Sequence, residues 1–205
     1  MKTQTHTILE EGVYADLHLD PFIEIEGSIN AQGILLADKI EFEQNEALSK
    51  IETTIDSINV QEKTLVVFGK TIHVDHSTLL WDENPLNKQP LQFEQLLIGD
   101  TVDIKLKIQA DGRFLAKRLS REAAESQASF QGFAKNINTI EQRFVLLGID
   151  MLSNVNTQYI NADEEIISAD DFFNRLQQNS TFIELKGEKI HDNMLLMQSV
   201  KLVNF

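Results

Sequence analysis

The amino-acid sequence predicts an all-β protein made of tandem small barrels, and two observations lead to this prediction. Short segments such as "TVDIKLKI" (101–108) alternate apolar and polar residues, a pattern typical of strands with one buried face. The same pattern also returns along the chain. "INAQGILLADKIEFE" (29–43) and "IQADGRFLAKRLSRE" (108–122) both indicate a hairpin, and the offset between Gly33 and Gly112 within them is 112 − 33 = 79. A fixed period of this length indicates an internal repeat.

The same offset extends over most of the chain. It relates glycine, aromatic and aliphatic positions alike: Ile25 to Ile104, Gly69 to Gly148, Phe93 to Phe172, and Ile104 to Ile183. The final hairpin of the third copy departs from it by two positions, so that Asp111 matches Asp192. We expect this insertion at the hairpin tip, where two extra residues leave both strand faces unchanged.

Each complete copy predicts three strands, a polar loop with a short helix, and two further strands. The opening strands are "IETTIDSINV" (51–60) and "TLVVFG" (64–69), joined by a polar turn. "LVVF" and its counterpart "FVLL" are apolar throughout, which favours burial on both faces. In the third copy, Ser168 is a suitable N-cap for a helix, with Asp170 and Asp171 in its first turn. Five strands with one short helix before the fourth strand suggest a closed or half-open barrel, OB-like or SH3-like.

The repeat also sets the expected domain boundaries. Residues 51–121 form the second module and residues 130–205 the third, each a complete barrel of a size that can fold alone. Residues 1–46 form an incomplete first module, because the start of the second module projects back to a position before Met1. We therefore expect this first module to hold only a helical turn and the final hairpin.

The hairpin of the first module, residues 22–43, has an apolar face of Ile23, Ile25, Leu36 and Ile40 without its usual partner strands. An isolated hairpin is marginal in water and its edges invite pairing. We expect an ordered hairpin docked on the second module, with homodimerisation through residues 22–43 as the alternative.

Composition excludes several classes of protein. The chain of 205 residues is 42% hydrophobic, and its 32 acidic and 18 basic residues give a formal net charge of −14. Such a surface repels a phosphate backbone, so nucleic acid is not an expected partner. The absence of cysteine excludes disulfides and thiolate chemistry. No apolar run is long enough for a transmembrane segment, and the N-terminus has no recognisable signal peptide.

Two longer segments show a family resemblance. "EEGVYADLHLDPFIEIEGSINAQGILLADKIEFE" and "FEQLLIGDTVDIKLKIQADGRFLAKRLSRE" carry a Gly-Asp-x-Val strand, an Asp-Gly turn and an alanine-containing final strand. These features resemble the bacterial domain-of-unknown-function family 5666. The resemblance implies tandem small β-barrels in exported proteins, hence an extracytoplasmic location (periplasm or cell surface), without an assigned activity. The motif residues Gly99, Asp100, Asp111, Gly112 and Ala116 match turn and packing positions, so the family supplies no site residues.

Few residues suggest chemistry. His73, Asp75 and His76 are candidate metal ligands, although structural metal sites generally need four ligands. Trp81 is a candidate for stacking on a sugar or a peptide, or else it caps the end of the barrel. The common nucleotide-binding, hydrolase and metalloprotease motifs are absent, so no catalytic residue and no cofactor is expected.

The sequence therefore favours a non-catalytic extracytoplasmic repeat protein that acts as a spacer, adhesion or binding module toward an unknown protein or glycan. The alternative is an OB-type ligand-binding or nucleic-acid-binding protein. This alternative requires aromatic and basic residues interleaved on the sheet surface. The central strands offer mainly aliphatic residues instead. An enzyme is the third class, and the repeat provides no convergent polar residues for one.

Overall fold

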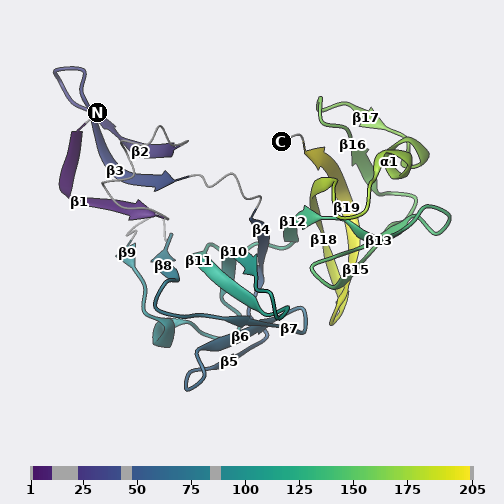
Figure 1. The fold of residues 1–205 in the computed structure, drawn as a ribbon, viewed down its shortest axis with the longest axis horizontal. Coiled ribbons are helices and arrows are strands. Elements are labelled where there is room, and N and C mark those ends of the chain that lie inside the picture. The colour runs from purple at the N-terminus through teal and green to yellow at the C-terminus, as the bar shows by residue number, and fades with distance from the viewer. Residues whose placement is uncertain (1, 11–22, 43–47, 84–88, 204–205) are drawn as a thin grey trace. The chain divides into compact units, whose positions relative to one another are not determined.

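A computed structural model describes residues 2–10, 23–42, 48–83 and 89–203 (Figure 1). The chain divides into two compact units, residues 1–47 (unit 1) and residues 48–205 (unit 2), which are considered separately below. Strands dominate both units, and a seven-residue segment is the only α-helix of the described residues. The all-β prediction is confirmed. No helix among these residues has the length and apolar character needed to span a membrane.

Unit 1 is a three-stranded sheet in the order β1-β3-β2, with β1 Lys2–Glu10, β2 Ile23–Ile29 and β3 Leu35–Phe42. β2 and β3 form the antiparallel hairpin that the sequence predicts. β1 pairs parallel to β3 and was not predicted. Ala37 and Ile40 are buried, and Leu9 and Ile25 pack against them. The hairpin is therefore ordered and shares a small core with β1, while the predicted helical turn lies outside the described residues.

Unit 2 consists of one sixteen-stranded sheet that holds the second and third modules. The second module comprises β4 (Ser49–Thr54), β5 (Ser57–Asn59), β6 (Thr64–Val67), β7 (Lys70–His73), β8 (Leu79–Asp82), β9 (Gln89–Pro90), the 3-10 helix η2 (Phe93–Gln95), β10 (Thr101–Ile108) and β11 (Phe114–Glu122). The third comprises β12 (Ala128–Phe133), β13 (Lys135–Asn138), β14 (Arg143–Leu146), β15 (Ile149–Leu152), β16 (Gln158–Ile160), β17 (Ile166–Ile167), the helix α1 (Ala169–Arg175), β18 (Phe182–His191) and β19 (Met194–Val203).

The two modules have the same strand order when the sheet is followed outward from its centre. This order is β4-β10-β11-β7-β6-β5 in the second module and β12-β18-β19-β15-β14-β13 in the third. The short strands β8 and β16 pair parallel to β11 and β19, inside segments that the sequence predicts as loops. The path ends at β5 and β13 without returning on itself. The described ladders therefore form an open sheet and do not close into the expected barrels.

The predicted helix is present as α1, which follows its N-cap Ser168. The Ser168 side chain accepts a hydrogen bond from the Asp171 backbone N–H, and Asp170 and Asp171 lie in the first turn. The apolar face of the helix buries Phe172 and Phe173. The second module has only the short η2 at the corresponding place, where Phe93 is buried instead.

The two modules join through their first strands, β4 and β12, which pair antiparallel. Ile51 of β4 lies opposite Phe130 of β12, and these residues are themselves 130 − 51 = 79 positions apart. The contact is thus isologous, because each module offers the same strand to the other. The apolar residues of both modules form one core cluster, in which the Phe130 ring meets Phe68 edge-on, with 5.1 Å between the ring centroids.

The insertion in the third module does not lie at the hairpin tip, in contrast to the expectation from the sequence. Ile104 of β10 pairs with Leu119, and Leu185 of β18 pairs with Val200. Both strands of the hairpin therefore share one larger offset, since 185 − 104 = 81 and 200 − 119 = 81. The insertion precedes β18, and Leu185, rather than Ile183, is the counterpart of Ile104. A shift by two positions keeps every side chain on its face, so alternation in the sequence does not reveal it.

Each of the three hairpins contains a β-bulge at the same place. The bulges follow Glu26, Lys105 and Lys186 in the first strand of the hairpin. In each case a threonine hydroxyl donates to a carbonyl oxygen in the second strand: Thr7 to Ala37 (2.6 Å), Thr78 to Ala116 (2.7 Å) and Thr157 to Met197 (2.8 Å). The threonine thus satisfies a backbone acceptor that lies where the bulge disrupts the ladder.

Candidate functional site

The three candidate metal ligands are only partly brought together. His73 ends β7 and, with Asp75, lines a cavity of about 200 Å³ that His76 does not line. The Asp75 carboxylate accepts hydrogen bonds from the side chain (2.7 Å) and backbone N–H (2.8 Å) of Ser77, and these bonds lower its pKa. Asp75 therefore closes a local turn. In the part of the chain that the structure describes, no group of three His, Asp or Glu side chains is placed to hold a metal ion.

Trp81, the candidate stacking residue, lies on β8 between Leu80, which packs on the core, and the buried Asp82. It is half-buried and is opposite Ser120 of β11 and Pro90 of β9 in the ladders. Because successive side chains in a strand alternate, Trp81 faces away from the core that Leu80 joins. It therefore does not belong to the described core cluster, and its interpretation as a barrel cap stays a prediction.

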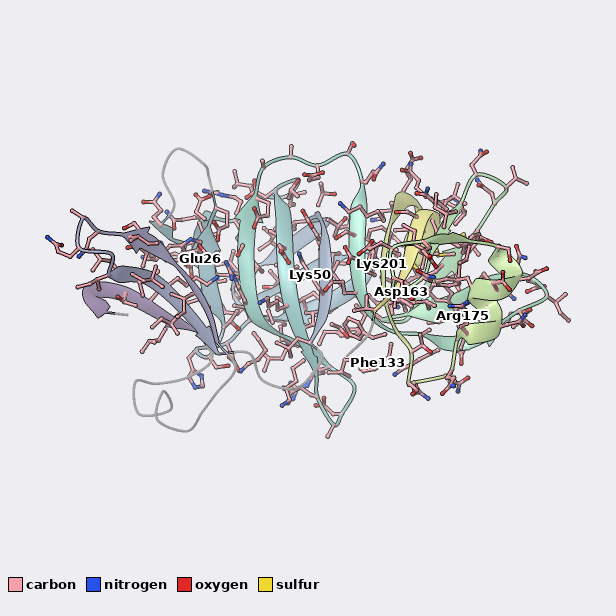
Figure 2. The ribbon with its side chains drawn as sticks, turned by 90° about the horizontal axis from the view of Figure 1, so that it is seen from above. Glu26, Lys50, Phe133, Asp163, Arg175 and Lys201 are labelled. Carbon is pink, nitrogen blue, oxygen red and sulfur yellow. The ribbon has the colours of Figure 1, made fainter. Side chains whose placement is uncertain are left out.

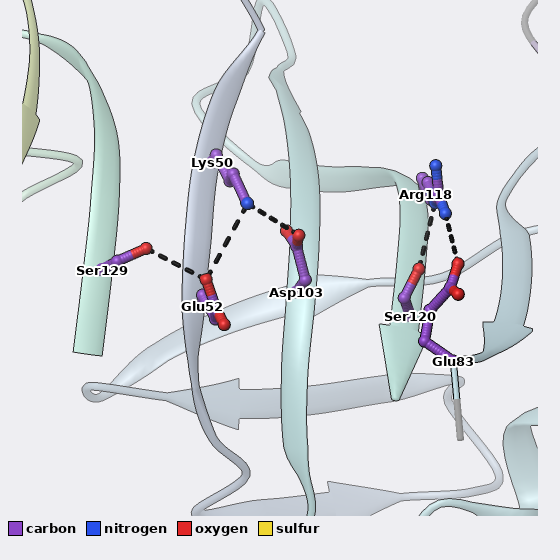
Figure 3. A network of polar contacts seen from close by, with 7 residues as sticks. All are labelled: Lys50, Glu52, Glu83, Asp103, Arg118, Ser120 and Ser129. Carbon is purple, nitrogen blue, oxygen red and sulfur yellow. Dashed lines mark hydrogen bonds and ion pairs between the residues drawn. The ribbon is translucent and has the colours of Figure 1, made fainter. Parts of the chain in front are cut away.

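A polar network that the sequence analysis did not identify lies on the central strands of unit 2 (Figure 3). The Lys50 ammonium of β4 is 2.7 Å from Asp103 Oδ2 of β10 and 3.8 Å from Glu52 Oε2. The Ser129 hydroxyl of β12 donates to Glu52 Oε2 at 3.2 Å, across the junction of the two modules. The network therefore ties β10, β4 and β12 together on the face opposite to the core residue Ile51.

A second part of the same face involves β11. Arg118 donates from Nε to the Ser120 hydroxyl (3.0 Å) and from a terminal nitrogen to Glu83 Oε1 (2.8 Å). Glu83 follows β8 directly, so this ion pair fixes the short parallel strand β8 against β11. The side chains of Arg118 and Glu83 are only 14% and 15% exposed, which is low for an ion pair on an outer face.

Carboxylates outnumber cations in this network, and their pKa values reflect this. Burial raises the pKa of Asp103 more than the attraction of Lys50 lowers it. Asp103 Oδ1 is buried and has no hydrogen-bond partner among the described residues. Burial also raises the pKa of Glu122, and repulsion from Asp103, Glu83 and Glu52 adds to the effect. For Lys50, burial works against the charge, but Asp103 and neighbouring carboxylates outweigh it and raise the pKa.

This arrangement holds strands together and offers little chemistry. Its two cations and three of its carboxylates are engaged with one another, so they form no open pair of acid and base. Elsewhere in unit 2, Lys201 of β19 forms an ion pair with Glu164, and Arg175 lies in the last turn of α1 (Figure 2 labels Lys201 and Arg175). A cavity of about 570 Å³ in the third module lies along β13 and β14 and is lined by Asn136, Asn138, Thr139, Arg143 and Asp150, together with apolar residues.

Comparison with known proteins gives one result beyond the fold. No curated protein and no solved structure matches the chain. A family model described as "Domain of unknown function (DUF5666)" matches residues 1–41 and 52–120, that is, most of unit 1 and the second module. This match covers more than half of the 205 residues and agrees with the resemblance seen in the sequence. The chain belongs to this family of domains of unknown function (DUF5666).

Proposed function

We propose that this chain is a non-catalytic, extracytoplasmic β-repeat protein whose unit 2 is a rigid spacer for binding or adhesion. One observation carries the proposal: the two modules of unit 2 share one sheet and one core, rather than being joined by a flexible linker. Inter-domain contacts within a chain are commonly small and permit relative motion unless they are large and apolar. A shared core with buried aromatic contacts across the junction belongs to the second case.

Contacts away from the central strands also support rigidity. Lys189, in the β18–β19 hairpin, forms an ion pair with Asp56 of the second module at 2.7 Å. Its ammonium lies 5.0 Å from the centre of the Phe68 ring. The backbone N–H of Asn193 donates to the carbonyl of Phe68 at 3.2 Å. The tip of one module's hairpin is thus fixed to a turn of the other module.

Hydrogen exchange tests the rigidity on the full chain. We expect the amides shared between β4 and β12 to exchange as slowly as those of β10 and β18, because all four strands open only when unit 2 unfolds. Faster exchange at the β4–β12 ladder, with protected β10 and β18, would show two modules that move independently and would contradict a rigid spacer.

We further propose that each module is a half-open barrel of the OB-like or SH3-like kind. The support is the bend between β4 and β5, where Ile55 N–H donates to the carbonyl of Asp100 and Asp56 N–H donates to the carbonyl of Val66. One continuous segment thereby bonds both to the loop before β10 and to β6. We expect nuclear Overhauser contacts between Ile55 and the region of Asp100, and between Asp56 and Val66. Their absence would favour a simple open sheet.

The location and the binding partner are also proposals. Family resemblance supports export, so fractionation of the bacterium that makes the protein is expected to recover it outside the cytoplasm. Recovery in the cytoplasm would refute this.

The partner is an unknown protein or glycan, for which the polar groove along β13 and β14 offers side-chain donors and acceptors. A glycan array tests whether the partner is a glycan that binds in this groove. The full chain is compared with an Arg143→Ala variant, and any binding signal of the full chain should be lower for the variant.

The alternative of an OB-type nucleic-acid binder is disfavoured by the net charge of −14. Fluorescence anisotropy with labelled single-stranded DNA and RNA at physiological salt is expected to show no submicromolar binding. Tight binding that weakens steeply with salt would support this alternative instead.

A further inference from the structure

We propose that the free edge of β2 in unit 1 is a strand-acceptor site, which binds an extended, basic segment of another protein as an additional strand. The segment would place a lysine directly beside an isoleucine, as β4 does with Lys50 and Ile51. This inference concerns unit 1 alone, so it does not depend on the spacer role proposed for unit 2.

The first step is that unit 1 repeats a recognisable part of a complete module. In unit 1, β3 pairs parallel with β1 and antiparallel with β2, just as β11 pairs parallel with β8 and antiparallel with β10. The bulge after Glu26 corresponds to the bulge after Lys105, at the offset of the repeat. The Thr7 hydroxyl bonds the carbonyl of Ala37 as the Thr78 hydroxyl bonds that of Ala116. β2 is therefore the counterpart of β10.

The second step is that both complete modules cover this edge with a strand. β4 pairs antiparallel with β10, and β12 pairs antiparallel with β18. In unit 1, β2 is at the end of the sheet and pairs only with β3 among the described strands. A strand edge presents a row of backbone donors and acceptors that readily pairs with another extended chain.

The third step excludes β4 and β12 of this chain as the strand that covers β2. β4 is bonded on both sides, to β10 and to β12, and β12 is bonded to β4 and to β18. Neither strand has an edge left for β2. A second copy of unit 1 is disfavoured by charge, because residues 1–47 contain ten acidic and two basic residues, for a net charge of 2 − 10 = −8.

The fourth step gives the chemistry of the partner. On the β10 edge, Lys50 of the covering strand pairs with Asp103 at 2.7 Å, and Ile51 lies opposite Ile104. At the offset of the repeat, the corresponding residues of β2 are Glu24 and Ile25, again an acid beside an isoleucine. Ile29 at the end of β2 is 72% exposed. The edge therefore suits a segment with lysine and isoleucine in the order found in β4.

The test uses a fluorescein-labelled peptide with the sequence of residues 48–56 and the change Glu52→Lys, titrated into the full chain and followed by anisotropy. We expect saturable binding at least tenfold tighter than that of a scrambled peptide of the same composition. Glu24→Lys in the chain should weaken binding about tenfold. A peptide with Lys50→Glu should restore it, and this rescue separates a charge contact from misfolding.

The other results would overturn the proposal. Equal binding of the scrambled peptide, or no binding at all, would show that β2 is not a strand acceptor. Sedimentation velocity tests whether another copy of this chain occupies the β2 edge instead. A homodimer that the peptide does not dissociate would assign the edge to this second copy.

Discussion

Truncation of Phe130 tests whether the two modules of unit 2 unfold together. Phe130 is fully buried, lies at the centre of the β4–β12 junction and contacts the Phe68 ring of the other module. A buried Phe→Ala change typically costs about 3–5 kcal/mol. The lost edge-on aromatic pair adds about 0.5–1.5 kcal/mol. Because the site is fully enclosed, we expect Phe130→Ala to lower the free energy of unfolding by roughly 5 kcal/mol.

The single tryptophan of the chain makes the assay specific. Trp81 belongs to the second module, whereas Phe130 belongs to the third, so Trp81 fluorescence reports on the module that is not mutated. With a urea m-value of about 2 kcal/mol/M, a loss of roughly 5 kcal/mol lowers the midpoint by about 2.5 M. Circular dichroism is expected to show the same midpoint as Trp81, as required for a single cooperative transition.

Phe172→Ala is the matched control, because Phe172 is also fully buried but contacts Tyr159 and Phe173 within the third module. If unit 2 is one cooperative body, this distant change also lowers the midpoint reported by Trp81. The reasoning is refuted if Trp81 keeps its wild-type midpoint in Phe172→Ala while circular dichroism shows an earlier second transition. The modules would then unfold separately, and any effect of Phe130 would be local.

Four further outcomes are expected. Gly187→Ala should destabilise unit 2 severely in thermal melts, because an added Cβ would clash with the carbonyl oxygen of Leu196 in the facing strand. In the control Gly112→Ala, the added Cβ meets open space, so the change costs only about 1 kcal/mol for the positive φ. Similar losses of stability in the two variants would contradict this prediction. Thr157→Val should cost about 1–3 kcal/mol, since it leaves the carbonyl at the bulge unsatisfied, and an unchanged urea midpoint would remove the threonine from that role. Glu122→Gln should raise the melting temperature at pH 7 and not below pH 4. The reason is that a carboxyl with a raised pKa stabilises the folded state while it is protonated, and this contribution is lost as the pH rises through the folded pKa. An equal gain in melting temperature at both pH values would contradict this prediction. Zn²⁺ or chelator should leave the melting temperature unchanged, and a shift of many degrees that His73→Ala abolishes would restore the metal hypothesis.

Much of the local structure followed from the sequence. Alternation located the hairpin strands, such as β10, because strand side chains alternate between a buried and an exposed face. The Ser168 cap and its acidic turn marked the start of α1, since capping depends only on residues within one turn. The family resemblance was also readable, because turn residues such as Gly99 and Gly112, both at positive φ, have a local backbone requirement.

The sequence did not reveal β1, although a faint signal was present. "THTILE" (5–10) resembles "HSTLLW" (76–81), in which Thr7 and Thr78 form the same bond at a bulge. The offset between these two threonines is 78 − 7 = 71 rather than 79, so a search at the constant period misses them. The Lys50 and Arg118 networks had no sequence signal, because their members come from strands that are far apart in the chain.

By itself, the sequence determined which residues form strands, which face of each strand is apolar, and where the pattern is copied. Only the tertiary structure decided that β4 pairs with β12, that the insertion precedes β18, and that β8 and β16 add to the sheet in parallel. The physical reason is that alternation has a period of two and specifies faces, not neighbours. The choice of neighbour depends on which apolar faces bury each other, as Phe130 and Phe68 do although they belong to different modules, and on which backbone edges remain to be paired.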